Sequence, residues 1–305
     1  MRARDLAMLV ALAAIWGMSY LFIRVAVVPL GPLAVAFLRV VIAGVGLAAV
    51  ALLGRRRGDI PSLDRRFLVL GVANAAIPYA AISFAELHIT ASMAAILNAT
   101  TPLFAAVVAA TWDRERLATR TIAGILIGFA GVAVLVGWNP SPADGWFGLA
   151  VAAMLAASFA YGFATVYAKR TLRNVSSFGA ATGQQIGAAV VLAPFAFASA
   201  AFGEVDAAPG TGVVLAILGL GLLCTSLAYL LYFRLIETVG PVRTASVTFL
   251  VPIFGIGWSA LFLGDAVRPS MLLGLAIILA SVVLVGGVRP PRWLRNAVPA
   301  PRPGG

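Results

Sequence analysis

The sequence predicts an all-α membrane protein with ten transmembrane helices arranged as two inverted five-helix repeats, and three observations indicate this fold. Of 305 residues, 62% are hydrophobic and 11% are charged, whereas soluble domains are nearer half apolar and a quarter charged. Apolar runs recur from Leu6 to Val288, which is far more than one span requires. The two halves of the chain also match when one is shifted along the other by about 145 to 150 residues.

Ten apolar runs of about 20 residues, separated by Gly, Pro and Arg, supply the spans. In chain order they are residues 6–28, 33–53, 67–88, 91–111, 119–138, 146–168, 177–200, 211–234, 241–263 and 269–288. The connections are short and leave no room for a soluble domain. The N-terminus starts like a signal peptide, but its apolar run continues to about Val28, which favours a retained first helix.

The basic residues indicate that both termini are cytoplasmic. With the N-terminus inside, 19 of the 22 Lys and Arg fall on the cytoplasmic side, leaving Arg24, Arg39 and Arg268. The basic tail, residues 289–305, then lies on anionic lipid. A formal charge of +11 also raises nucleic acid as a partner, but the charges lie in short runs between spans, which argues against it.

The internal repeat divides the chain into an N-terminal repeat at 1–138, a C-terminal repeat at 146–288 and the tail. Each repeat has five spans, and because five is odd, the second enters the membrane in the opposite direction, as in many secondary transporters. The matched pairs are Trp16 with Tyr161, Gly17 with Gly162, Arg24 with Lys169, Arg39 with Gln184, Tyr79 with Tyr229, Pro102 with Pro252, Phe104 with Phe254, Glu115 with Asp265, and Gly124 with Gly274.

Three stretches carry a resemblance to a known family. They are "AIWGMSYLFIR" at 14–24, "AFLRVVIAG" at 36–44, and a proline followed by an acid 13 residues on and a glycine nine further. Together with the ten spans, they resemble the EamA-type branch of the drug/metabolite transporter superfamily over essentially the whole chain. The resemblance implies movement of small metabolites or xenobiotics, often export of amino acids, without ATP. The absence of a GxxxxGK[ST] loop from the sequence agrees with this.

Aromatic residues on two matched helix faces are candidates for a substrate path. Trp16 and Tyr20 share one face of the first span by their spacing, and Tyr161 lies on the matching face of the sixth. Aromatic residues at such spacing often serve packing alone, so both roles stay open. A pocket of this kind would suit apolar or aromatic amino acids, or amphipathic drugs.

Three spans carry a proline four residues after a polar residue, which frees a backbone carbonyl inside the membrane. Such a carbonyl must be satisfied by protein or face a wet cavity, which makes these positions candidates for the substrate path. The alternative is a kink that serves packing. The pairs are Asn74 with Pro78, Asn98 with Pro102, and Thr248 with Pro252.

Polar stripes in the third and eighth spans add Tyr79 and Tyr229 to the path candidates. The first stripe ends in Glu86, with His88 just after it, and these are the acid and the imidazole that could carry a coupling proton. Alternatively, they form an interfacial pair in contact with water. The first span has no acid, so the carboxylate mechanism of the small multidrug relatives does not carry over.

Arg39 lies six residues inside the second span, and Gln184 lies at the matching position of the seventh. An arginine at mid-helix costs about 2.5–3.5 kcal/mol on insertion scales. Either its head reaches outward and anchors the helix, or it faces the bundle and meets Glu86, freed carbonyls or a substrate carboxylate.

Other functional classes fit the sequence less well. One His, one Cys and spans without Asp offer no metal set or catalytic pair, so we expect no enzyme and no cofactor. A channel would need a ring of ligands or a re-entrant filter. Gly124 and Gly128 suit packing within the bundle, or dimerisation. We therefore expect a carrier in the cytoplasmic (inner) membrane of a bacterium, monomeric or homodimeric, with a small-molecule substrate and the lipid bilayer as its partners.

Overall fold

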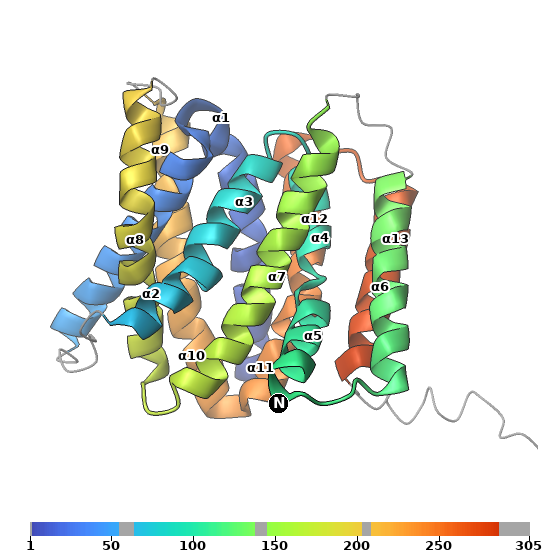
Figure 1. The fold of residues 1–305 in the computed structure, drawn as a ribbon. Coiled ribbons are helices and arrows are strands. Elements are labelled where there is room, and N and C mark those ends of the chain that lie inside the picture. Colours follow the sequence, from blue (N-terminus) through green and yellow to red (C-terminus); the bar gives the residue numbers. More distant parts are fainter. Residues whose placement is uncertain (1, 55–63, 138–144, 203–208, 287–305) are drawn as a thin grey trace, which may run out of the picture.

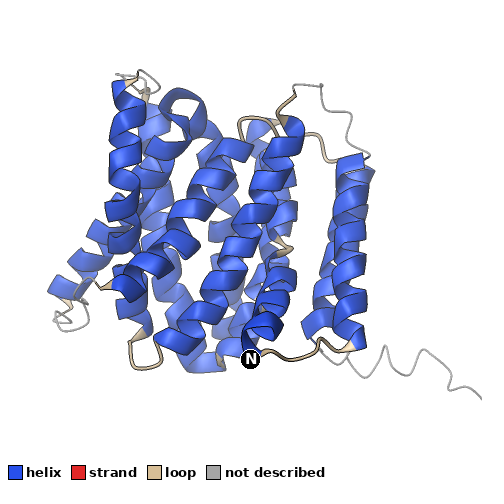
Figure 2. Cartoon of the chain, in the orientation of Figure 1, coloured by secondary structure: helices blue, strands red, loops and turns tan. Residues whose placement is uncertain are grey.

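The computed structural model describes residues 2–54, 64–137, 145–202 and 209–286, and within these ranges all regular structure is helical (Figure 2). The predicted basic tail, residues 289–305, lies outside the described residues. The first half contains α1 (Ala3–Leu53), α2 (Arg65–Gly71), the π-helical η2 (Val72–Ala76), α3 (Ile77–Ala85), α4 (Ala91–Asn98), α5 (Thr101–Asp113) and α6 (Thr119–Gly137). The second half contains α7 (Phe147–Thr171), α8 (Ser177–Ala201), α9 (Thr211–Leu218), the π-helical η3 (Gly219–Leu227), α10 (Ala228–Val239), α11 (Pro241–Ala245), α12 (Val247–Leu263) and α13 (Pro269–Gly286).

In the described part of the chain, nine helices are long and apolar enough to cross a membrane, one fewer than the ten expected. The difference lies in α1, which joins the expected spans 6–28 and 33–53. As a straight helix α1 would be roughly 76 Å long, more than twice the roughly 30 Å of hydrocarbon in a bilayer. Gly31 interrupts it with φ 73° and ψ 160°, a conformation open to glycine because it lacks a Cβ. Figure 1 shows α1 running to the end opposite the N-terminus and bending back there.

Four of the expected spans are not single α-helices. The span from Arg65 to Ala85 contains η2, and the span from Thr211 to Val239 contains η3. Adding the repeat offset of 150 to η2 gives residues 222–226, which lie inside η3. The spans that begin at Ala91 and at Pro241 are each broken, at residues 99–100 and at Ser246. Both halves therefore depart from regular helix at matching places.

The two halves also meet through matching glycine contacts. A Cβ on Gly17 of α1 would lie 2.7 Å from the Cβ of Phe254 in α12. A Cβ on Gly162 of α7 would lie 3.1 Å from the Cβ of Phe104 in α5 and 2.7 Å from the next backbone nitrogen. The sequence repeat pairs Gly17 with Gly162 and Phe104 with Phe254. The same close contact between helices therefore occurs twice, with the glycine in the first half in one case and in the second half in the other.

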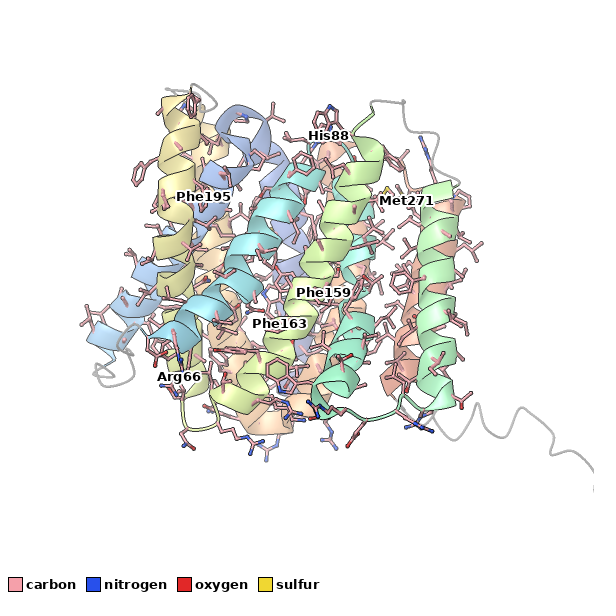
Figure 3. All side chains as sticks on the ribbon, in the orientation of Figure 1. Arg66, His88, Phe159, Phe163, Phe195 and Met271 are labelled. Carbon is pink, nitrogen blue, oxygen red and sulfur yellow. The ribbon has the colours of Figure 1, made fainter. Side chains whose placement is uncertain are left out.

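The glycine face of α6 packs on α13, and Figure 1 shows the two helices side by side. A Cβ on Gly124 would lie 2.6 Å from Val285, and one on Gly128 would lie 2.7 Å from the hydroxyl of Ser281. The predicted packing role of these glycines within the bundle is therefore confirmed. Large apolar side chains such as Leu126 and Phe195 (Figure 3) stay exposed on outer helix faces, as lipid contact requires.

Candidate functional site

A cavity of about 610 Å³ lies between the two halves of the bundle. Both halves line it, through α1 to α5 in the first and α7, α8, η3, α10 and α12 in the second. Eleven of the twelve residues predicted for the substrate path contribute to the wall. They are Trp16, Tyr20, Arg39, Asn74, Tyr79, Asn98, Pro102, Tyr161, Gln184, Tyr229 and Thr248. The exception, Pro78, is buried but does not line the cavity.

Aromatic rings form one side of the cavity. The ring of Trp16 lies 5.5 Å from the ring of Tyr232, centre to centre, so a residue of the first span meets one of the eighth. Tyr20 is buried, and Tyr161 faces the same space from α7. The rings of Trp16 and Tyr232 pack against each other and also line the cavity, so a packing contact does not keep Trp16 from the cavity wall.

A chain of amide and hydroxyl groups crosses the cavity wall. Asn74 of η2 donates from Nδ2 to Oε1 of Gln184 over 2.7 Å, and Gln184 donates from Nε2 to the hydroxyl of Tyr229 over 2.6 Å. Gln184 is only 3% exposed, so its amide depends on these partners. The wider turn of η2 presents Asn74 to the opposite half, in keeping with the frequent occurrence of π-helical turns at functional sites.

Arg39 points into the bundle and is 6% exposed. Its Nε donates to the hydroxyl of Thr225 in η3 over 3.1 Å, and its guanidinium carbon lies 3.9 Å from the centre of the Tyr79 ring. The surface-anchor alternative is therefore wrong. In the described part of the chain no acidic side chain lies within ion-pair distance of Arg39, so Glu86 is not its partner either.

Asn98 ends α4, and Pro102 stands at the start of α5, where its missing N–H costs no helix bond. The carbonyl of Asn98 accepts a hydrogen bond of 2.8 Å from the hydroxyl of Thr101. The freed carbonyl is thus satisfied by protein, while the Oδ1 atom of Asn98 has no partner in the described residues and borders the cavity. Pro78 likewise stands at the start of α3, directly after η2.

Thr248 lies in the first turn of a helix and not in the middle of one. The expected span 241–263 begins with the short α11, and α12 starts afresh at Val247, which places Thr248 in its first turn. Thr248 is exposed at the mouth of the cavity, and its hydroxyl donates to the carbonyl of Ala245 over 2.8 Å.

Glu86 and His88 lie away from the cavity. The side chain of Glu86 is fully buried, and neither carboxyl oxygen has a hydrogen-bond partner in the described residues. Its backbone carbonyl accepts a hydrogen bond from Arg24. The ring of His88 stacks on Trp146 at 5.7 Å, and Figure 3 shows His88 at the end opposite the N-terminus. The predicted pair in contact with water is therefore wrong for Glu86.

The cavity opens at the end of the bundle where the N-terminus lies. Its lining there includes the exposed residues Lys169 and Ser177, which flank the connection from α7 to α8 (Figure 1). At the opposite end, Asp265 accepts a hydrogen bond of 3.3 Å from the hydroxyl of Ser92, which joins the two halves. The lining residues toward that end, such as Ile23 and Ile82, are buried, whereas those at the end of the N-terminus are exposed.

Sequence reasoning missed several lining residues. Ser19 shares the face of Trp16 and Tyr20, so the helical spacing could have revealed it. Lys169 and Cys224 also line the cavity, and Cys224 is buried and donates to the carbonyl of Ile15 over 3.1 Å. Within the ranges that the structure covers, no three His, Cys, Asp or Glu side chains gather as a metal site would require.

Known proteins resemble this chain throughout its length. The profile of the EamA-like transporter family matches residues 5–137 and 148–287. The chain is 30% identical to YedA of Escherichia coli K12, an uncharacterised inner membrane transporter, over 91% of this chain and 89% of YedA. It is 27% identical to YvbV of Bacillus subtilis, an uncharacterised transporter, over 72% and 70% of the two chains. A solved crystal structure shares the fold, with a TM-score of 0.66, 19% identity, and coverage of 96% of this chain and 99% of the other.

Proposed function

Because this chain belongs to the EamA-like transporter family, and so is a membrane transporter and not an enzyme, we propose that it is a secondary carrier in the inner membrane of a bacterium. It exports small metabolites, amino acids or similar amphipathic compounds, by alternating access through the central cavity. Its relative YedA of Escherichia coli is an inner membrane transporter.

The cavity between the halves is the observation that carries this proposal. Its volume of about 610 Å³ falls within the roughly 300–1,000 Å³ of small-molecule sites. Aromatic rings of Trp16, Tyr161 and Tyr232 offer apolar contact, while Arg39 and Gln184 offer a few placed polar groups. That combination suits a molecule with an apolar body and a polar end.

Alternating access is supported by the pairing of contacts between the halves. The contact of Gly17 with Phe254 and that of Gly162 with Phe104 join residues that the repeat relates. Exchange of the roles of two related halves is how inverted-repeat carriers open to either side. In the proposed topology α1 crosses twice around Gly31, which gives ten spans, five in each half, with both termini cytoplasmic and the open end of the cavity facing the cytoplasm.

Glu86 is the proposed site of proton coupling, with His88 as the second candidate. The carboxyl of Glu86 is buried without a hydrogen-bond partner in the described residues, while Arg24 bonds the backbone carbonyl of the same residue. A conformation open at the opposite end would expose that carboxyl to water and release its proton. Movement of Glu86 between these environments would link proton transfer to the transport cycle.

Two other functions compete with this proposal. A multidrug efflux carrier would use the same aromatic wall, but the lining in the described residues contains no acid to pair with the cationic drugs common among such cargo. A channel would need a continuous path, whereas the lining residues toward one end of this cavity, such as Ile23 and Ile82, are buried.

Counterflow in liposomes tests the carrier function. Purified protein is reconstituted, the vesicles are loaded with a panel of unlabelled amino acids and organic acids in turn, and uptake of the same labelled solute is followed. A carrier gives saturable uptake that rises when the loaded solute is present inside. Uptake that is linear in concentration and indifferent to loading would indicate a channel and contradict the proposal.

A further inference from the structure

The cavity carries positive charge without an acidic counter-charge. Its lining in the described part of the chain includes two cations, Arg39 and Lys169, and no Asp or Glu. Lys169 is exposed at the open end, whereas Arg39 is 6% exposed in the interior. Because arginine keeps its proton in proteins, the interior holds a fixed positive charge. A buried charge is ordinarily paired, so the cavity lacks one half of an ion pair.

The geometry around Arg39 leaves one edge of its guanidinium unused. The Nε–H bonds to Thr225, and the Tyr79 ring covers one face of the group at 3.9 Å. Neither terminal nitrogen makes a hydrogen bond to any described residue, and Arg39 borders the cavity. The terminal nitrogens therefore carry N–H donors without a protein partner. Donors in this planar fork match the two oxygens of a carboxylate.

We propose that Arg39 binds the carboxylate of the transported substrate, and that the substrate class is organic carboxylates with an apolar or aromatic body. This rests on the proposed carrier function, because it assigns the ligand of the same cavity. The body of the ligand lies against the rings of Trp16, Tyr161 and Tyr232. An amino group is not required for recognition, since no described lining residue carries the negative charge that an ammonium group would prefer.

Contacts on both sides of Arg39 hold it in place for this role. Thr225 fixes Nε from the second half of the chain, and Tyr79 stacks on the guanidinium from the first. The hydroxyl of Thr225 also donates to the carbonyl of Leu220 over 2.7 Å, so its lone pairs are directed at Arg39. Such a preorganised guanidinium loses little conformational freedom when a carboxylate arrives.

Three probes and three variants test the proposal. Binding of 3-phenylpropionate, phenylalanine and phenethylamine to the purified full chain is measured by quenching of tryptophan fluorescence. Both acids should bind, and phenethylamine, which has no carboxylate, should bind at least about tenfold more weakly. Arg39→Gln should weaken both acids about 10- to 100-fold, the range of a charge-assisted hydrogen bond. Arg39→Lys keeps the positive charge but lacks the planar guanidinium. Its affinity for the acids should lie between those of the wild-type chain and Arg39→Gln. Arg66→Gln, which removes an exposed charge that does not line the cavity, should leave the binding of both acids unchanged.

Several results would overturn the assignment. They are phenethylamine binding as tightly as 3-phenylpropionate to the wild-type chain, neither acid binding, or Arg39→Gln binding the acids normally. Because the probe comparison uses the wild-type chain, it decides the question even if Arg39→Gln does not fold. Counterflow of some other solute without acid binding would refute this inference and leave the carrier function standing. If the acids bound in a way that depends on Arg39 but no solute showed counterflow, the carboxylate assignment would stand and the carrier function would be refuted.

Discussion

Gln184 takes in the second half of the chain the structural role that Arg39 takes in the first. Arg39 bonds directly to Thr225 in η3 of the second half, and Gln184 bonds directly to Asn74 in η2 of the first. Each residue also meets a tyrosine of its own half, and these two tyrosines, Tyr79 and Tyr229, are themselves a matched pair. The two related sites therefore differ mainly in charge, because Arg39 is positively charged and Gln184 is neutral.

Neighbouring glutamines in α8 allow a matched test of the cavity network. Gln184→Leu should lower transport and destabilise the protein by about 1–3 kcal/mol, because Asn74 and Tyr229 lose a buried partner. Gln185 is also buried, but neither of its polar atoms has a partner in the described residues. Gln185→Leu should therefore be neutral or stabilising. Thermal unfolding and counterflow of both variants check this, and equal losses would contradict the network.

The contact between Gly17 and Phe254 should tolerate no added side chain. Gly17→Ala would place a Cβ 2.8 Å from the backbone nitrogen of Gly255, so the two helices must separate, at a cost of about 1–3 kcal/mol. The control is Gly257→Ala in α12, where no atom lies within 4 Å. Alanine favours helix over glycine by about 1 kcal/mol, so this variant should be as stable as the wild type or more so. The melting temperatures of the two variants decide between these outcomes.

Glu86→Gln should uncouple transport from protons while sparing exchange. A permanently neutral side chain keeps the buried form of Glu86 but cannot release a proton. In liposomes, an imposed pH gradient should drive wild-type accumulation and fail to drive that of the variant, while counterflow persists in both. His88→Gln is the companion variant and should still respond to the gradient. If the pH gradient drives accumulation by Glu86→Gln but not by His88→Gln, then His88 is the coupling group. If it drives accumulation by both variants, neither residue is the coupling group.

Single cysteines test the proposed topology, since Cys224 is the one cysteine of the chain. In a Cys224→Ser background, Ala266→Cys should react with a membrane-impermeant thiol reagent in intact cells. Arg4→Cys and Gly54→Cys, at the two ends of α1, should both react only after permeabilisation. Labelling of these two from opposite sides would show that α1 crosses the membrane once, and would refute the ten-span arrangement.

The sequence predicts the broad fold because apolar length and basic connections are local properties. Eight of the nine candidate spans agree in position with a predicted span to within a few residues, and the ninth, α1, combines the first two. The departures from regular helix escaped prediction. No residue pattern distinguishes the π-helical turns η2 and η3 from ordinary α-helix, because tertiary contacts select them.

The sequence predicts which residues line the cavity, but not which of them contact one another. Polar and aromatic residues inside spans face the interior, and eleven of twelve candidates do line one cavity. Which groups meet depends on how the halves dock. The contact of Arg39 with Thr225 spans 186 residues of sequence, so its partner stayed open until the structure placed them together. The break at Ser246, which places Thr248 in the first turn of α12, was not predicted.

The shared π-helical turns have a consequence for the history of the chain. A π-helical turn accommodates one more residue than the α-helical turn it replaces, and it rotates everything beyond it by about 100°. Both halves carry such a turn at matching positions, in η2 and η3, before the matched Tyr79 and Tyr229. A single insertion that preceded duplication of one half accounts for both turns with one event. The cavity-facing Tyr79 and Tyr229 would then derive from one position that is older than the two-domain chain.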